Sequence, residues 1–307
     1  MARRKKGNPI HGWIILDKPV GMTSTQAVGK VRWLYQAQKA GHAGTLDPLA
    51  TGVLPIALGE ATKTVPYAID GKKSYRFTVR WGIETDTDDA EGRPIRTSGS
   101  RPTGAQIEAC LPQFRGEFLQ TPPQFSAIKV EGHRAYDLAR GGETVALAPR
   151  RVVIDKLELI GMPDAETAVF EAECGRGTYV RALARDIGRL LGCLGHVTQL
   201  RRTRVAAFTE DSAVTIAQLE AAHGADDGGA QLRRLLQPVE LALTDLIEVT
   251  VGTHDAARLA RGQPVLMRGR DAPIISGEAY AISKGTLIAL CQMEKGELIP
   301  TRVFHYQ

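Results

Sequence analysis

Residues 41–52 form the stretch on which the interpretation of this chain depends: Gly41-His42-Ala43-Gly44-Thr45-Leu46-Asp47-Pro48-Leu49-Ala50-Thr51-Gly52. Asp47 precedes a proline in a segment rich in Gly and Thr, and each of these residue types stabilises turns. An apolar run, Val53 to Leu58, follows, so we expect the loop to be pinned on a rigid scaffold. Locally, Asp47 is either a turn residue or a catalytic carboxylate. His42, Thr45 and Thr51 supply neighbouring hydrogen-bond donors for a polar ligand.

Strand-like and helix-like patterns surround this loop. We expect strands at residues 12–16, 73–81, 152–160 and 168–174, and helices that start after Thr23 or Ser24, after Thr103, and at Thr178. Tyr75 lies on the apolar side of the second strand, where core packing is its local interpretation. Arg181 lies off the apolar face of the last helix, so the pattern by itself permits a surface arginine.

Two later regions have a different character. The segment from Gln120 to Arg151 contains Pro122-Pro123 and Gly141-Gly142, which indicates an irregular excursion with at most one short helix, at residues 136–140. Loops of that length are often functional. Beyond Thr244 short strand-like runs appear without helical periodicity, which predicts a small β domain. The chain therefore reads as α+β, with a first domain at residues 1–244 and a second at 245–307.

The composition permits a polyanionic partner without requiring one. Of 307 residues, 43% are hydrophobic and 24% charged, which is typical of folded globular proteins. Lys and Arg number 39 against 34 Asp and Glu, and the sequence pI is about 9.0. Short basic clusters, each either a phosphate contact or a solvated surface, lie at residues 3–6, 72–73, 150–151, 201–204 and 233–234.

Cysteine usage and hydropathy narrow the class of protein. The four cysteines are scattered, with no Cys-x-x-Cys pair and no histidine at zinc-ligand spacing, so we expect neither a zinc site nor a disulfide framework. No stretch approaches the ~18 apolar residues of a membrane span. The basic N-terminus does not lead into an apolar signal core, which predicts a cytoplasmic protein with no membrane partner.

Five segments in a fixed order resemble one known family. Residues 41–55, continued by Gly59-Glu60-Ala61-Thr62-Lys63, closely resemble the catalytic motif of the TruB family of tRNA pseudouridine-55 synthases, bacterial type. The resemblance extends through residues 16–24, 122–129, 177–181 and 195–202, and thus covers most of the first ~210 residues. Ala43 stands where the family usually has Thr, which removes a hydroxyl beside the loop. We expect little harm from this, since neighbouring donors remain.

The resemblance implies a fold and a reaction. The fold is a pseudouridine synthase domain on a mixed, mainly antiparallel sheet flanked by helices and loops, followed by a small PUA-like β domain that touches RNA. The reaction is isomerisation of the T-loop uridine of tRNA to pseudouridine, without cofactor or metal. The partner is tRNA. No obligatory protein partner is implied, and a monomer is expected.

The resemblance also assigns roles to residues of this chain. Asp47 is the nucleophile, Arg181 its charge partner and Tyr75 the ring that stacks on the flipped base. His42 takes the place of the flipped nucleotide, Tyr179 holds the uracil or ribose edge, and Leu200 contacts the base. Locally, His42 could instead be a turn histidine. Lys18 and Lys63 serve either structural pairing or phosphate contact, and the sequence does not separate these alternatives.

The excursion at about 120–151 corresponds to an RNA-gripping insertion, in which Lys129, His133, Arg134 and Arg140 can meet phosphates. Two other functions compete with a stand-alone enzyme. A guide-RNA-dependent relative of the dyskerin kind shares the aspartate loop but needs partner proteins and a longer C-terminal region. A noncatalytic RNA chaperone would tolerate loss of Asp47, so the complete loop argues against chaperoning as the sole function, although tRNA folding can accompany catalysis.

Overall fold

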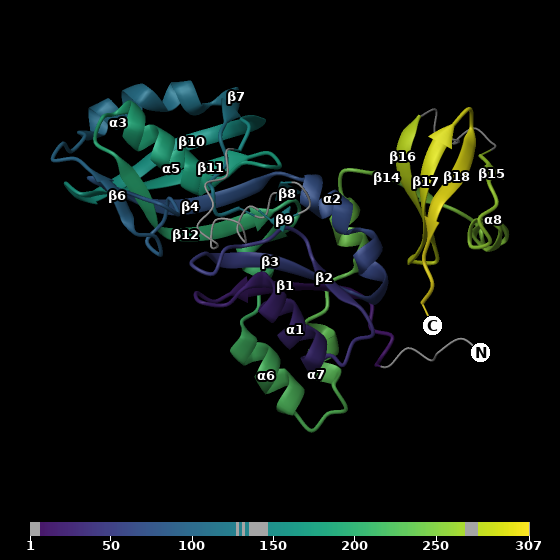
Figure 1. Ribbon diagram of the computed structural model, residues 1–307. Coiled ribbons are helices and arrows are strands. Elements are labelled where there is room, and N and C mark those ends of the chain that lie inside the picture. Colours follow the sequence, from purple (N-terminus) through teal and green to yellow (C-terminus); the bar gives the residue numbers. More distant parts are fainter. Residues whose placement is uncertain (1–6, 127–128, 131–132, 135–146, 268–275, 307) are drawn as a thin grey trace.

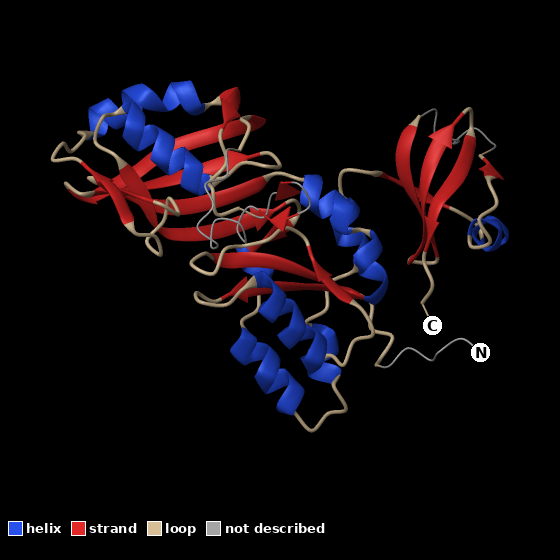
Figure 2. Ribbon diagram, in the orientation of Figure 1, coloured by secondary structure: helices blue, strands red, loops and turns tan. Residues whose placement is uncertain are grey.

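A large sheet organises the first part of the molecule (Figures 1 and 2). The computed structural model describes residues 7–126, 147–267 and 276–306, with the backbone of 129–130 and 133–134. All strand pairs of this sheet are antiparallel except that of β12 with β3. The spatial order is β1 (Gly12–Lys18), β3 (Thr51–Leu58), β12 (Gly195–Val205), β4 (Lys73–Trp81), β11 (Thr167–Cys174), β10 (Arg150–Asp164) and β7 (Gly116–Gln120), with β2 (Ala40–His42) beside β3 and β13 (Phe208–Thr209) beside β12.

Helices cover this sheet in two groups, as Figure 1 shows. One group lies over β4, β10 and β11, and comprises α3 (Gly104–Cys110) and α5 (Val180–Leu190). The other gathers beside β1 and β3, and comprises α1 (Ser24–Leu34), α6 (Ile216–Gly224) and α7 (Ala230–Arg234). Two further two-stranded sheets are separate from it: β5 (Ile83–Thr85) with β6 (Pro94–Thr97), and β8 (Lys129–Val130) with β9 (His133–Arg134).

Helix starts follow a repeated sequence device. Thr23 and Thr103 each accept a hydrogen bond from the amide three residues later, and the Gln at that position caps the threonine amide in return. These two capping boxes satisfy amides that the first helical turn leaves without partners. They confirm the helix starts expected at Thr23 and Thr103. A third box, Thr215 with Gln218, starts α6 in the same way.

Apolar alternation on β4 builds the core under α3 and α5. Phe77, Val79 and Trp81 are almost fully buried. Phe77 stacks on Phe170 of β11 with ring centroids 5.3 Å apart, and Trp81 meets the same ring edge-on at 6.2 Å. Aromatic pairs in these arrangements add to the gain from burial. The strand expected at residues 73–81 is confirmed, and its polar side remains at least partly exposed.

The C-terminal residues form a second sheet, which lies beyond α2 (Val65–Asp70) in Figure 1. Its spatial order is β14 (Ile247–Thr250), β16 (Gly277–Ser283), β17 (Thr286–Glu294), β18 (Glu297–Val303) and β15 (Val265–Leu266). The expected β character of this region is confirmed. A short helix, α8 (Thr253–Leu259), was not expected there, because only two of its seven side chains are buried and no apolar periodicity marks it.

The junction between the two sheets is an apolar cluster flanked by 3-10 turns. Trp13 of β1, Leu243 and Phe304 belong to this cluster. The turns are η1 (Gly59–Lys63) and η4 (Val239–Leu243), while η2 (Leu111–Phe114) and η3 (Glu210–Ser212) lie elsewhere. Together the elements confirm the expected α+β class with a mixed, mainly antiparallel sheet. The short helix expected at residues 136–140 falls outside the described residues, and no helix among the described ones is long and apolar enough to cross a membrane.

Candidate active site

The loop at residues 43–50 joins β2 to β3, and hydrogen bonds to its main-chain groups hold it in place. The Ser24 hydroxyl accepts a hydrogen bond from the Leu46 amide at 2.8 Å and donates to the Leu46 carbonyl at 3.0 Å. The Gly21 amide donates to the Pro48 carbonyl at 2.8 Å, and the Ala50 amide to the Asp47 carbonyl at 3.1 Å. Asp47 therefore sits between two fixed neighbours, as expected for a loop pinned on a scaffold.

Two buried cations support this loop from beneath. Lys18 has no exposed surface, and its ammonium donates to the carbonyls of Pro19, Met22 and Pro48 at 2.9, 2.7 and 3.3 Å. Burial lowers the pKa of Lys18 to about 8, with the Asp47 carboxylate opposing that fall. An amino group so enclosed cannot reach an RNA phosphate without movement, which favours the structural alternative for Lys18.

Arg202 of β12 is the second of these cations, and it is 1% exposed. Its guanidinium donates to the carbonyls of Val53 at 2.8 Å, Thr45 at 3.3 Å and Gly44 at 3.0 Å. The strand pairing that brings Arg202 here requires Gly52, whose φ is +96° and whose added Cβ would lie 2.2 Å from the Arg202 carbonyl oxygen. No side chain fits at that position. Sequence reasoning placed Arg202 in a basic cluster and missed this role.

Asp47 and Arg181 meet as the resemblance implies. The Arg181 Nε lies 2.9 Å from Asp47 Oδ2. The arginine side chain is 6% exposed, whereas that of Asp47 is 38% exposed. The carboxylate thus keeps an open side for a ligand while its charge is compensated from the protein side. The surface-arginine alternative for Arg181 is wrong, because strands and loops from elsewhere in the chain cover this end of α5.

The rest of the Arg181 guanidinium is also occupied. Nη1 donates to the Thr87 carbonyl at 2.8 Å and lies 3.4 Å from Asp89 Oδ2, and Nη2 donates to the Phe125 carbonyl at 2.9 Å. Asp89 is 3% exposed. An arginine that is fixed at every nitrogen presents Nε to Asp47 in one geometry.

Asp89 belongs to an acidic segment that sequence reasoning did not single out. Residues 85–92 read Thr-Asp-Thr-Asp-Asp-Ala-Glu-Gly, with four carboxylates in six positions. Such density of acidic groups between two short strands was the available signal. Burial, followed by the Asp89 and Asp47 carboxylates, raises the pKa of Glu91, which places Glu91 in the same electrostatic surroundings as Asp47.

Tyr75 lies on β4 opposite Arg202 and is only partly buried. Its ring packs against the main core, and burial raises the pKa of its hydroxyl to about 12, with Arg202 the largest opposing influence. Tyr75 therefore combines core packing with partial exposure of the residue. This placement is compatible with the expected stacking role, which stays a prediction.

Tyr179 precedes α5 and is fixed through its backbone. The side chain of Gln120, 1% exposed, accepts from the Tyr179 amide at 2.9 Å and donates to its carbonyl at 3.2 Å. Burial raises the pKa of the Tyr179 hydroxyl, and Asp47 is among the charges that add to the rise. Gln120 therefore positions Tyr179 beside the Asp47 loop, a role that the sequence did not reveal.

His42 and Leu200 lie at the two flanks of the loop. Burial, then the Arg202 charge, lowers the pKa of His42, so the imidazole is neutral at pH 7. Its buried Nδ1 has no hydrogen-bond partner among the described residues. Leu200 is 8% exposed and lines a hollow of about 430 Å³ together with Leu49, Thr51 and Phe77. Both placements suit the expected ligand contacts without testing them.

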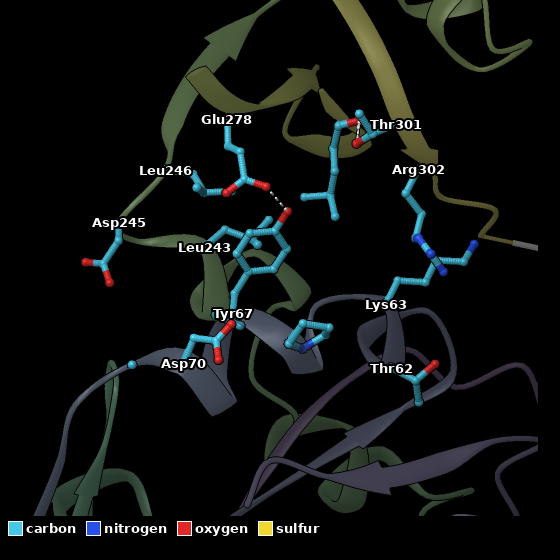
Figure 3. A pocket seen from close by; sticks show the side chains of 14 residues that line it. Thr62, Lys63, Tyr67, Asp70, Leu243, Asp245, Leu246, Glu278, Thr301 and Arg302 are labelled. Carbon is cyan, nitrogen blue, oxygen red and sulfur yellow. Dashed lines mark hydrogen bonds between the residues drawn. The ribbon is translucent and has the colours of Figure 1, made fainter. Parts of the chain in front are cut away.

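Lys63 lies in a different place, at the junction with the C-terminal sheet. Its ammonium pairs with Glu60, donates to the Val303 carbonyl at 2.8 Å and sits 5.5 Å from the centre of the Phe304 ring. These contacts favour structural pairing. The cavity beside it, about 620 Å³ and shown in Figure 3, is lined from α2 by Tyr67 and from the C-terminal sheet by Glu278 and Arg302. Asp47 is not among its lining residues.

Several basic residues proposed for phosphate contact are engaged within the protein. Arg201 pairs with Asp17 at 3.0 Å and with Glu210, Arg204 pairs with Glu173 at 2.6 Å, and Lys72 pairs with Asp155 at 3.2 Å. Arg202 belongs to the cluster at 201–204 but is buried. Both alternatives for that cluster, a solvated surface and a phosphate contact, are therefore wrong for Arg202. The side chains of Lys129, His133 and Arg134, and all of Arg140, fall outside the described residues.

Ala43 and the cysteines lie in buried surroundings. Ala43 is fully buried in the apolar cluster that contains Trp13 and Val53, so a methyl group suits its surroundings. Within the described residues, His, Cys, Asp and Glu nowhere gather in a group of three that could hold a metal ion. All four cysteines are buried free thiols.

Comparisons with known proteins agree with this geometry. Residues 32–180 match the model of the TruB family pseudouridylate synthase N-terminal domain, and residues 181–244 that of the tRNA pseudouridylate synthase B C-terminal domain. The chain is 59% identical to the tRNA pseudouridine synthase B of Nitrobacter winogradskyi, over 98% of this chain and 85% of that one. It is 54% identical to the same-named protein of Brucella melitensis biotype 1, over 99% of both.

A solved structure shares the fold across nearly the whole chain. The archaeal box H/ACA sRNP Nop10–Cbf5 complex matches with a TM-score of 0.73 and 25% identity, over 99% of this chain and 93% of that one. The arrangement around Asp47, the two family matches and the full-length relatives lead to one conclusion. The chain belongs to the TruB family of pseudouridylate synthases.

Proposed function

We propose that this protein converts the uridine at position 55 in the T loop of tRNA to pseudouridine, with Asp47 as the nucleophile. The observation that carries the proposal is the half-open Asp47 carboxylate, 2.9 Å from a fully engaged, buried Arg181. Relatives over 50% identical that are named tRNA pseudouridine synthase B support the tRNA substrate.

The chemistry needs a charged nucleophile and a closed pocket. An Asp47 oxygen attacks C1′ of the ribose or C6 of the uracil, and the bond between N1 and C1′ breaks. The detached uracil turns, a bond forms between C5 and C1′, the proton on C5 is lost and N1 gains a proton, and Asp47 is released. No atom is gained or lost overall. Arg181 compensates the carboxylate charge from behind and leaves the attacking side open.

The residues around the loop fit a base turned out of its stack. Tyr75 offers a ring face, Leu200 an apolar wall and Tyr179 a hydroxyl, and Gln120 holds Tyr179 in place. Neutral His42 is suited to fill the position that the flipped nucleotide vacates. An uncharged imidazole can stack between bases without the cost of removing a charge from water. Each of these five roles is part of the proposal.

We assign residues 1–244 to catalysis, with the insertion at about 120–151 as an RNA clamp, and 245–307 to a PUA-like RNA-binding module. The separate five-stranded sheet at the C-terminal end supports this division. Cytoplasmic tRNA is the substrate under this proposal, the protein acts as a monomer, and tRNA folding accompanies modification. Guide-RNA dependence is disfavoured because the 25% likeness to the Cbf5 complex is much lower than the 54–59% identity to the tRNA enzymes.

The test uses purified protein and unmodified tRNA with EDTA present. We expect one T-loop uridine to be converted, as mapped by carbodiimide labelling and primer extension. Asp47→Asn should abolish turnover while tRNA affinity stays within about threefold, since the amide keeps the shape but lacks the nucleophilic charge. Asp245→Asn, an exposed carboxylate at the junction cavity, is the matched control and should turn over normally.

Several outcomes would contradict the proposal. Normal turnover by Asp47→Asn would remove Asp47 as the nucleophile, and activity that requires an added guide RNA would favour the dyskerin-like alternative. For the insertion, Lys129→Ala should weaken tRNA binding and reduce the slope of affinity against salt by about one counterion. An unchanged slope would exclude Lys129 from the RNA interface.

A further inference from the structure

Three arginines of α5 form a ladder with the carboxylates of Glu84, Asp88 and Asp89. Arg181, Arg185 and Arg189 are four residues apart, so they lie along one face of the helix. Arg181 Nη1 is 3.4 Å from Asp89 Oδ2, and Arg185 Nη1 is 3.0 Å from Asp88 Oδ2. Arg189 binds Glu84 with two hydrogen bonds, of 2.9 and 2.8 Å. We call these contacts the arginine ladder, and only its first rung touches Asp47.

The second rung is buried on both sides. Arg185 is 7% exposed and Asp88 5%, and Arg185 Nη2 also donates to the Thr121 carbonyl at 2.7 Å. The desolvation cost of burying two charges can exceed the gain from their attraction, so such a pair is weak evidence for stability. The alternative is that this ion pair fixes the geometry of the residues around it.

The backbone at Asp88 gives that role a physical basis. Asp88 has φ +61°, in the left-handed region that non-glycine residues rarely adopt. Its carbonyl accepts from the Val197 amide at 3.1 Å, and its amide donates to the Thr85 carbonyl at 3.2 Å. The ion pair with Arg185 helps hold this turn, in which Asp88 lies between Thr87 and Asp89.

Thr87 and Asp89 are the two partners of Arg181 Nη1. If Asp88 moves, both of these acceptors move with it, because they are its immediate neighbours in the chain. Arg185 also holds Thr121, four residues before Phe125, whose carbonyl receives Arg181 Nη2. The second rung therefore acts on both terminal nitrogens of Arg181.

We infer that Arg185 and Asp88 are positioning residues that set the Arg181 guanidinium against Asp47. The inference deepens the proposed function and rests on it for its catalytic consequence. Neither residue touches Asp47 or an open surface, so neither is a catalytic residue. The third rung joins Arg189, which is 48% exposed, to the buried Glu84 by two hydrogen bonds, and it lies a further turn of helix from Arg181, so it serves as the comparison.

The experiment compares Arg185→Met with Arg189→Met in the full-length protein. The first readout is ¹⁵N NMR of the arginine Nε–H groups, with the Arg181 signal assigned by Arg181→Lys. We expect Arg185→Met to shift the Arg181 signal towards that of a solvated arginine, and Arg189→Met to leave it unchanged. The samples are kept at pH 8, because burial raises the pKa of Asp88 to about 6 against the opposing Arg185 charge.

The second readout is turnover of tRNA. A shift of about 1 Å in a positioned group can cost up to about a hundredfold in rate, so we expect Arg185→Met to lower kcat at least about tenfold with little change in KM. Arg189→Met, which removes a half-exposed partner from the buried Glu84, should lower stability by no more than Arg185→Met does and should keep kcat within about threefold. Arg185→Lys, which keeps a buried cation, should recover part of the kcat and provides the test if the Met variant does not fold.

Two results would overturn the inference. One is an Arg181 signal that does not respond to Arg185→Met or Arg185→Lys. The other is an equal loss of kcat in the Arg185 and Arg189 variants, which would reduce the second rung to general stability. If the wild type makes no pseudouridine while the Arg181 signal still responds selectively, the proposed function fails and the positioning of Arg181 stands.

Discussion

The loop that carries Asp47 and the junction with the C-terminal sheet are both held by charged side chains, but in opposite ways. Beneath the loop, Lys18 and Arg202 are 0% and 1% exposed and donate to main-chain carbonyls. At the junction, Lys63 and Glu60 are 19% and 17% exposed, and a cavity of about 620 Å³ opens beside Tyr67 (Figure 3).

The difference in burial determines how much backbone movement each region tolerates. A buried cation bonded to several carbonyls allows one backbone arrangement, since any shift leaves polar groups unpaired in a dry site. Partly exposed ion pairs exchange with water at small cost and tolerate movement. The loop is therefore built to hold Asp47 still, and we expect the charged contacts at the junction to tolerate small shifts of the C-terminal sheet. If this contrast holds, substitutions beneath the loop should cost more stability and activity than substitutions at the junction.

The largest effect is expected from Arg202→Met. The change leaves three carbonyl groups, of Gly44, Thr45 and Val53, without their donor in the protein interior. We expect the free energy of unfolding to fall by about 3 kcal/mol and turnover to be lost, because the loop under Asp47 is released. Urea unfolding measures the first and the tRNA assay the second.

Arg204→Met is the control on the same strand. Arg204 pairs with Glu173 at 2.6 Å, but both side chains are about one-third exposed, so we expect a loss of at most about 1 kcal/mol. If the two variants lose the same stability, burial does not separate these arginines and the contrast between the two regions is broken.

The second prediction uses the lowered pKa of Lys18, which is about 8 in the folded protein against 10.5 for an ordinary lysine. Between these values the unfolded chain binds more protons than the folded one, so the folded state gains stability as pH rises. From pH 7 to pH 9.5 the gain is about 2 kcal/mol. The difference in unfolding free energy between wild type and Lys18→Met should grow by that amount, since Lys73 and other titrating groups are common to both.

Urea unfolding of the two proteins at pH 7 and pH 9.5 measures this difference. A constant difference would mean that the Lys18 ammonium is solvated in the folded state, and it would remove the distinction from Lys63. A difference that shrinks with pH would mean that Lys18 is held mainly by the Asp47 charge and not buried against it.

Some features of the fold and of the site could be predicted from the sequence alone, and others could not. Strand β4, the capping boxes at Thr23 and Thr103 and the α+β class followed from local patterns, because alternation and caps act over a few residues. The contact between Asp47 and Arg181 was predicted only from the family resemblance, since 134 positions separate the two residues. No local pattern reports a contact over that distance.

The parts that could not be predicted share one physical cause. Arg202, Gln120 and Asp89 have polar side chains that are buried because partners far along the chain satisfy them. Polar residues are expected at the surface unless such partners exist. Only the fold supplies the partners, so these three residues carried no signal of burial in the sequence. Helix α8 was missed for the opposite reason, because too little of it is buried.

The third prediction concerns the junction. Glu60 accepts from Lys63 and from the His305 amide at 2.8 Å, and so ties the end of the chain to η1. In a double-mutant cycle of Glu60→Gln and Lys63→Met we expect a coupling energy of about 1 kcal/mol. Turnover should stay within about twofold, because the loop under Asp47 is untouched. A tenfold loss of kcat would show that the junction and the loop act as one rigid unit.

The smallest effect is expected from Tyr67→Phe. The Tyr67 hydroxyl lies 3.2 Å from Glu278 Oε1 across the junction cavity, where water can replace it (Figure 3). We expect a change in unfolding free energy within about 0.5 kcal/mol. Tyr35→Phe is the matched control, since the Tyr35 hydroxyl is buried and donates to the Leu232 carbonyl at 2.7 Å. Its loss should cost about 1–2 kcal/mol, because the buried Leu232 carbonyl is left with only the longer bond, of 3.2 Å, from the Leu235 amide. If urea unfolding gives the same loss of unfolding free energy for both variants, the junction excludes water as completely as the core does. The expectation that the C-terminal sheet can shift would then be wrong.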